Sequence, residues 1–224
     1  MLTKFFNVLF VAGIALAVDK PVKPEINAKL KTTATELEKL QLVKDDYVFD
    51  FKKHEYFTYS PGGVVNANAA NFPAATGHGL TIAWLALGPC AMLPPHHHPR
   101  ATNFVVAVEG QTQTWMVQEN GADPVTTTLN PGQLTIFPRG SLHTMQNTGC
   151  GNATLISALD SDDTGTLNIL NSLFKLPNDM VQAAFGGVSG SNSTEGSGSS
   201  VPGVGTGAAL GSEECLVMCG MGKH

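Results

Sequence analysis

Three consecutive histidines, His96, His97 and His98, are the residues of this chain whose type and spacing point most directly to chemistry. In an extended strand successive side chains point to opposite faces, so His96 and His98 share one face and His97 takes the other. Two imidazoles on one face can bind one metal ion. A solvated histidine tract is the alternative interpretation, because short tracts of one residue type are common.

A further histidine, His143, supplies a third possible ligand. It follows a turn, a short apolar run over 134–137 and a second turn at Pro138-Arg139-Gly140, a pattern that predicts two strands. If both histidine segments are strands of one small barrel, His143 faces the same interior point as His96 and His98. Three neutral imidazoles would then surround one cation, a ligand set suited to a divalent first-row metal.

These two segments resemble the two sequence motifs of the cupin superfamily, in particular those of its germin and spherulin branch. The first family motif is His-x-His, four residues, Glu, six residues and Gly, and the corresponding residues here are His96, His98, Asn103 and Gly110. The second motif is met by Gly132, Pro138, Gly140, His143 and Asn147. The likeness covers roughly residues 47–185 and implies a jelly-roll β-barrel with manganese as its metal.

The fourth ligand position departs from the family pattern, because Asn103 stands where the resemblance implies a glutamate. An amide can coordinate through its carbonyl oxygen, but it brings no negative charge. A cation at this site would be held less tightly and would act more strongly as a Lewis acid. We therefore expect the site to bind a metal, and we have less reason to expect the catalytic activity of the family.

Strand alternation predicts which side chains line the pocket. Counting by two from His143, Met145 and Asn147 point inward, and the residues between them point away. Phe104 and Phe137 are candidates for the pocket mouth, although core packing is the commoner role of phenylalanine. A strand-end turn residue is the alternative interpretation of Asn147.

Apolar runs of strand length, separated by turns, predict an all-β domain over residues 47–185. They are Leu80–Leu87, Phe104–Glu109, Thr114–Gln118, Val125–Leu129, Leu134–Phe137, Leu142–Asn147 and Ala153–Leu159. Short strands at this regular spacing indicate a sandwich or barrel, and the jelly roll is the form that the resemblance implies. A further strand is predicted at Tyr47–Phe51, where apolar and polar residues alternate.

The chain before this domain is divided into a leader and an arm. Residues 1–17 combine one lysine, an apolar stretch too short to span a bilayer and an Ala-x-Ala ending, which predicts a secretory signal peptide. Residues 18–46 are predicted as an N-terminal arm that is extended as far as Leu30. A capping box at Thr35-Glu36-Leu37-Glu38 then opens a short helix that runs to Val43.

Two short helices and a tail are predicted after the strands. The helices cover 167–174 and 178–185, and in germin-like domains such helices join neighbouring subunits, so a homo-oligomer is possible. Residues 186–224 form the tail, whose Gly and Ser content predicts flexibility as far as Gly211. The end beyond Cys215 is expected to be tethered by its cysteines.

The four cysteines allow three disulfide pairings, and a Cys90–Cys150 bond is favoured because both residues flank predicted strands. Cys215 and Cys219 would then close a small terminal loop. Two sequons, at Asn152 and Asn192, are candidate glycosylation sites and agree with an exported protein.

Composition excludes some classes of partner. The 224 residues include 13 basic and 18 acidic ones, for a net charge of −5, and only Arg100, Arg139 and Lys175 are basic between 54 and 185. A domain with no basic stripe is not expected to bind nucleic acid. No stretch beyond the leader is apolar enough for a membrane span, so the expected mature protein is secreted and extracellular.

Two functions follow as hypotheses. The first is a secreted cupin that binds one divalent metal, with oxalate oxidase or superoxide dismutase activity of the germin type as the possible reaction. The second is a non-enzymatic extracellular wall, spore or storage protein of the spherulin kind, with a structural metal or none. A small-molecule ligand in the pocket, such as a sugar or hormone, has no specific residue in its favour.

Overall fold

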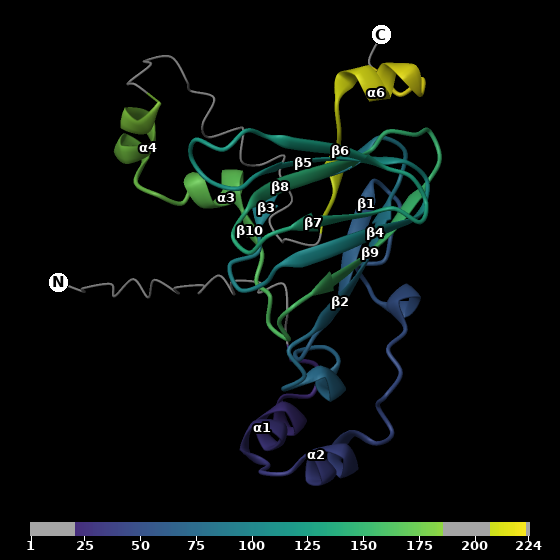
Figure 1. Ribbon diagram of the computed structural model, residues 1–224, viewed down its shortest axis with the longest axis vertical. Coiled ribbons are helices and arrows are strands. Elements are labelled where there is room, and N and C mark those ends of the chain that lie inside the picture. Colours follow the sequence, from purple (N-terminus) through teal and green to yellow (C-terminus); the bar gives the residue numbers. More distant parts are fainter. Residues whose placement is uncertain (1–20, 186–206, 223–224) are drawn as a thin grey trace, which may run out of the picture.

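Two antiparallel sheets enclose the core of the protein (Figure 1). The structure is a computed structural model, and it describes residues 21–185 and 207–222. The first sheet has the order β1 (Gly62–Ala67), β2 (Thr81–Leu87), β9 (Ala153–Leu159), β4 (Asn103–Glu109) and β7 (Leu134–Phe137). The second has the order β10 (Leu167–Asn168), β3 (Ala91–His97), β8 (Leu142–Asn147), β5 (Thr112–Val117) and β6 (Val125–Leu129), and β11 (Ala209–Leu210) pairs with β3.

The all-β jelly roll expected from the sequence is confirmed. Strands β6 to β9 have the predicted bounds. The runs predicted for β2, β4 and β5 differ from the observed strands by no more than a few terminal residues. These strands form because alternate side chains are apolar and meet across the two sheets. Leu87, Val105 and Leu155 are fully buried there. Burying each such side chain contributes about 1.5–3 kcal/mol relative to leaving it exposed.

The N-terminal arm is helical, not extended, so that part of the prediction is wrong. Helix α1 (Pro24–Thr32) begins with proline at its first turn, carries an acidic residue there and ends with lysines, an arrangement that matches the helix dipole. Helix α2 (Glu36–Val43) follows the predicted capping box, with the Thr35 hydroxyl accepting a hydrogen bond from the Glu38 amide. Both helices lie beyond the end of β2, away from α6 (Figure 1).

The predicted strand at Tyr47–Phe51 is also wrong. Phe51 begins a short 3₁₀ helix, η1 (Phe51–Lys53), and a second one, η2 (Pro73–Ala75), follows β1. Phe49 packs against Phe72 with ring centroids 5.7 Å apart, and Phe51 packs against Trp84 at 5.9 Å. Phe51 therefore packs against β2 of the first sheet and Phe49 packs against the segment that follows β1, and neither belongs to a strand.

Helices α3 (Ile169–Leu173) and α4 (Asn178–Ala184) confirm the two predicted short helices after the strands. Residues 186–206, with the sequon at Asn192, and the predicted signal peptide at 1–17 lie outside the described residues. From Gly207 the chain differs from the predicted tail, because β11 pairs with β3 and is followed by helix α6 (Glu213–Met218).

The predicted Cys90–Cys150 disulfide is wrong. Cys90 is bonded to Cys215, and Cys150 is bonded to Cys219. The pairing of Leu210 with Ala91 explains this connectivity, because it returns the chain end to the start of β3. Both bonds fasten the C-terminal segment, defined as residues 207–222, to the outside of the second sheet.

No helix within residues 21–185 and 207–222 is long and apolar enough to cross a lipid bilayer.

Candidate metal centre

The imidazoles of His96, His98 and His143 meet between the two sheets. His96 and His143 are directly paired across β3 and β8, with ring centroids 4.3 Å apart. The ring of His98 lies 5.2 Å from that of His96 and 5.4 Å from that of His143. One nitrogen of each ring can be chosen so that all three nitrogens lie within 4.8 Å of one another. This spacing suits one cation bound by three imidazoles.

Backbone carbonyls hold each of the three rings in one orientation. The Nδ1 atoms of His96, His98 and His143 lie 2.7, 2.7 and 2.9 Å from the carbonyl oxygens of Pro94, Gly165 and Ser141, respectively. A carbonyl oxygen can only accept, so each neutral ring carries its proton on Nδ1 and donates it. The lone pair is then on Nε2, the atom left for a metal.

Burial keeps the three rings neutral. Desolvation, with a smaller contribution from neighbouring histidines, lowers the pKa of His96 to about 3 and the pKa of His143 to about 2. The pKa of His98 is also lowered, mainly by desolvation. A metal ligand must be unprotonated, so these side chains are ready to bind a cation over the whole neutral pH range.

Two buried atoms test whether the residues fit a metal ion. Within the described part of the chain, Nε2 of His143 and Oδ1 of Asn103 have no hydrogen-bond partner. A buried polar atom without a partner is costly, and native structures seldom contain one without a reason. Both atoms are electron-pair donors of the kind that a cation binds. The predicted residues therefore fit a metal site, with Asn103 on β4 facing the histidines from the opposite sheet.

A small cavity of about 30 Å³ adjoins the histidines. Its walls include Met145, as predicted, together with apolar side chains from both sheets. The walls also include Asn66, Ser157 and Thr166, whose roles the strand pattern did not indicate. Asn66 lies on β1, in a stretch where the sequence allows the asparagines to reach a ligand, although turn formation is their commoner role. Ser157 and Thr166 belong to ordinary strand and loop sequences. The volume leaves room for only a few water-sized groups.

Two predicted lining residues lie elsewhere. Phe104 is 44% exposed and points away from the interior, because it follows the inward-facing Asn103 on the same strand. Asn147 is fully buried, but its side chain binds backbone groups and does not line the cavity. Its Nδ2 donates hydrogen bonds to the carbonyl oxygens of Leu87, Gly88 and Gly151. The turn interpretation of Asn147 is thus the correct one.

Phe137 lies beside the site, although it is not part of the cavity wall. Its ring stacks on the imidazole of His143, with centroids 4.2 Å apart and planes 8° apart. It is fully buried, so it combines core packing with support of a ligand.

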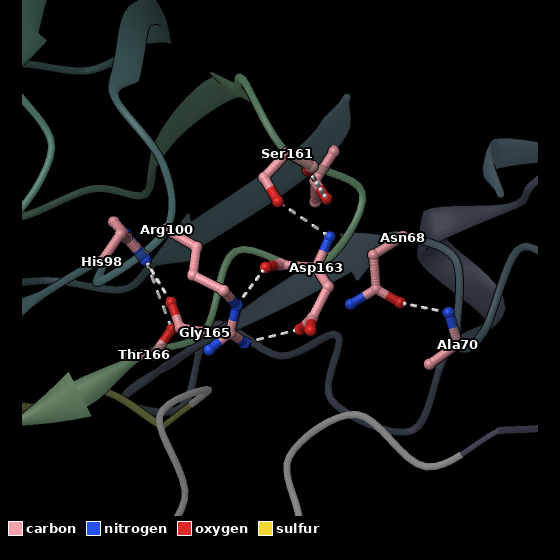
Figure 2. Close-up of polar contacts among 9 residues, drawn as sticks. Asn68, Ala70, His98, Arg100, Ser161, Asp163, Gly165 and Thr166 are labelled. Atoms are coloured by element: carbon pink, nitrogen blue, oxygen red, sulfur yellow. Dashed lines mark hydrogen bonds and ion pairs between the residues drawn. The ribbon is translucent and has the colours of Figure 1, made fainter. Parts of the chain in front are cut away.

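Arg100 is directed away from the cavity. Its Nε donates to the carbonyl oxygen of Asp163 at 2.7 Å, and its guanidinium forms an ion pair with the Asp163 carboxylate at 2.6 Å (Figure 2). The same loop supplies the carbonyl oxygen of Gly165 to His98 (Figure 2). Arg100 therefore helps to position the loop that holds His98 and offers no charge to a ligand inside the barrel.

The fold is an all-β jelly roll, and its candidate site combines three neutral imidazoles with a buried asparagine on the opposite sheet. The family model described as Cupin matches residues 51–192, and the chain belongs to the cupin family. Spherulin-1A from Physarum polycephalum is 32% identical over 200 residues, which are 88% of this chain and 80% of that protein. Germin-like protein 1-1 from Oryza sativa subsp. japonica is 33% identical over 153 residues, covering 66% and 70% of the two chains.

The comparison with solved structures agrees on the fold. A structure of oxalate oxidase superimposes with a TM-score of 0.59 and 21% identity, covering 69% of this chain and 83% of that one. At this identity the likeness establishes the fold and leaves the reaction to be argued from the site.

Proposed function

We propose that this protein is an extracellular cupin that binds one divalent metal ion through Nε2 of His96, His98 and His143. The observation that carries the proposal is the convergence of three neutral imidazoles whose Nδ1 atoms are all occupied by carbonyl oxygens. Oδ1 of Asn103 or a water molecule completes the coordination. Manganese is the metal that the resemblance to germins suggests, and the imidazoles themselves also suit other divalent first-row metals.

The chain's own residues shape what a bound metal can do. A metal there would supply Lewis acidity and, in the case of manganese, one-electron redox chemistry. The apolar cavity walls exclude bulk water, and the neutral amide of Asn103 leaves the charge of the cation largely uncompensated. Small ligands such as dioxygen, superoxide or a small carboxylate are the substrate class for this space. Oxalate oxidase or superoxide dismutase activity of the germin type is therefore the reaction to test.

A non-enzymatic role is the second candidate. Three observations favour it: the fourth ligand is neutral, the cavity is narrow, and Arg100 is paired with Asp163 outside the barrel instead of facing a substrate. Similarity to a spherulin over most of the chain points the same way. In this role the protein is an extracellular wall, spore or storage protein, and the metal is a structural clip or is not bound at all.

Extracellular location is supported by the predicted leader, two disulfides and an exposed sequon at Asn152. Exposed apolar side chains on α4, among them Met180, suit a homo-oligomer. Neither nucleic acid nor a membrane is proposed as a partner.

Metal analysis of the purified protein, followed by removal and re-addition of the metal, tests the proposal. We expect one metal ion per chain, and we expect a His143→Ala variant to lose it. Turnover of oxalate or superoxide on re-addition would support the enzyme, whereas a higher melting temperature without turnover would support the structural clip. A protein that binds no divalent metal under any of these conditions would contradict the metal site and would leave only a wall, spore or storage role without metal.

A further inference from the structure

A second and much larger hollow lies outside the barrel, between the second sheet and the C-terminal segment. It has a volume of about 490 Å³, within the roughly 300–1,000 Å³ typical of small-ligand sites. We call it the outer groove, and its floor is the outward face of β5 and its neighbours, while α6 forms one wall. The side chains used in the argument are Gln111, Gln113, Trp115, Gln146, Glu214 and Met218.

The floor of the outer groove carries polar groups that the fold does not use. Gln113 and Trp115 alternate on β5 with the buried Thr112 and Thr114, so they point outward. Within residues 21–185 and 207–222, the side-chain amide of Gln113 and the indole N–H of Trp115 make no hydrogen bond. A partly buried indole next to a free amide offers a flat apolar surface and hydrogen-bonding groups together.

The charge of the outer groove selects the class of ligand. Its lining contains no lysine, arginine or histidine, and its one charged side chain is Glu214. Among the described residues Glu214 forms no ion pair. An anionic ligand would find no compensating charge here and would be repelled by that carboxylate. A neutral ligand rich in hydroxyl groups would find acceptors in Glu214 and Gln113, and donors in Gln113 and Trp115.

The position of the groove argues against a peptide. Strand β5 lies between β8 and β6 and is paired with both, so its backbone groups are already hydrogen-bonded. Peptides that bind sheets commonly pair with an open edge, which the face over β5 does not provide. The hydroxyl groups and apolar ring faces of a sugar, by contrast, match a face made of side chains.

The wall of the outer groove is fixed covalently. Cys215 on α6 is bonded to Cys90, Cys219 is bonded to Cys150, and the Gln146 side chain exchanges two hydrogen bonds with Ser212. A preformed wall reduces the entropy lost on binding. Gln146 therefore builds the site, whereas Gln113 and Trp115 remain available to a ligand.

We propose that the outer groove binds a neutral oligosaccharide, with Trp115 as the stacking platform and with Gln113 and Glu214 as hydrogen-bonding partners. The proposal is independent of the metal centre, which lies on the other side of the same sheet.

Isothermal titration calorimetry of the full chain with cellohexaose, laminarihexaose and chitohexaose tests the proposal, with polygalacturonate as the anionic comparison. We expect at least one neutral oligosaccharide to bind and polygalacturonate not to bind. Trp115→Ala should weaken binding by about tenfold or more, and Gln113→Ala should weaken it by a smaller factor. Phe104→Ala is the matched control, because it truncates an exposed aromatic residue on the outward face of the other sheet. This variant should bind as the wild type does.

Melting temperature and metal content show that each variant is folded, and Trp115→Phe, which keeps an aromatic ring, should retain part of the affinity. Several outcomes would overturn the proposal. The proposal fails if no neutral oligosaccharide binds, if Trp115→Ala binds as tightly as the wild type, or if the protein prefers polygalacturonate. A wild-type dimer that becomes monomeric on Trp115→Ala substitution would assign the groove to a second copy of the chain instead.

Discussion

Phe137 and His143 lie with their rings parallel, 4.2 Å apart, although they belong to different sheets. Phe137 ends β7 in the first sheet, and His143 lies on β8 in the second. The stack therefore spans the interior. Phe137 contacts the imidazole of His143 from the opposite sheet and fixes the plane of that ring. A residue of the core thus determines where the Nε2 lone pair of a candidate metal ligand points.

Truncation of Phe137 should cost both stability and metal affinity. We expect Phe137→Ala to lower the free energy of unfolding of the metal-free protein by about 3–5 kcal/mol, because a fully buried ring is replaced by a cavity. Metal affinity should also fall, because His143 loses the support that holds its ring. Urea unfolding and metal titration measure the two effects. Phe104→Ala is the control, and its exposed ring should cost less than about 1 kcal/mol. Equal costs for the two variants would refute this account of the core.

A carboxylate at position 103 should destabilise the metal-free protein and should strengthen metal binding. Without metal, Asn103→Asp places a buried charge next to neutral rings and should destabilise the fold. With metal, the negative charge should strengthen binding on the order of tenfold or more, the scale at which neighbours alter metal sites. Thermal melting with and without Mn²⁺ measures both. A substitution that stabilises the metal-free protein, or weakens metal binding, would show that residue 103 does not face the cation.

Stability of the metal-free protein should fall as pH decreases from about 6.5 towards 3. In this range the unfolded chain protonates its histidines, whereas His96, with a pKa of about 3, and His143, with a pKa of about 2, stay neutral in the fold. The unfolded state therefore binds more protons, and each of these histidines lowers the free energy of unfolding by about 1.4 kcal/mol per pH unit. Urea unfolding across this range measures the slope. A His143→Gln variant should give a shallower slope, and an unchanged slope would contradict the burial of that ring.

Much of the candidate metal centre was predictable because the side chains that form it carry a local signal. His96 and His98 share a face by strand alternation, and the motif spacing brings His143 and Asn103 into the same set. The same alternation places Phe104 outside once Asn103 is inside, so that residue was misassigned by disregarding its neighbour. Asn147 was harder, because its three carbonyl partners come from other parts of the chain.

The parts that the sequence did not reveal depend on contacts between distant segments. Four cysteines allow three pairings, and the correct one follows from β11 pairing with β3, which no local pattern indicates. Phe49 and Phe51 show strand-like alternation, but their partners, Phe72 and Trp84, belong to other elements. Period-two hydrophobicity identifies a half-buried segment and does not by itself show that the segment pairs in a sheet.

Peptide mapping without reduction should find Cys90 linked to Cys215 and Cys150 linked to Cys219. Digestion should be done at acidic pH after alkylation of any thiol in the sample, because a thiolate could exchange the two bonds, whose sulfurs lie close together, with 3.6 Å between Sγ of Cys90 and Sγ of Cys219. Removing the first bond by Cys90→Ser and Cys215→Ser should cost about 2–5 kcal/mol. A Cys90–Cys150 peptide would show instead that the C-terminal segment is fastened in another way.

Gly211 should be essential for docking of the C-terminal segment. A Cβ at this position would meet the Gln146 amide and would lie 2.7 Å from the carbonyl oxygen of Cys90, a backbone atom that cannot move aside. Gly211→Ala should therefore break the hydrogen bond from the Gly211 amide to that carbonyl, which is 2.8 Å long, and displace the segment from β3. Amide hydrogen exchange over 207–222 should become faster, while exchange in the barrel stays nearly unchanged, because the disulfides still tether the segment. Gly151→Ala is the matched control, since a Cβ there has nothing within 4 Å. Unchanged protection of residues 207–222 in Gly211→Ala would mean that the close approach of Gly211 to β3 does not exist in solution.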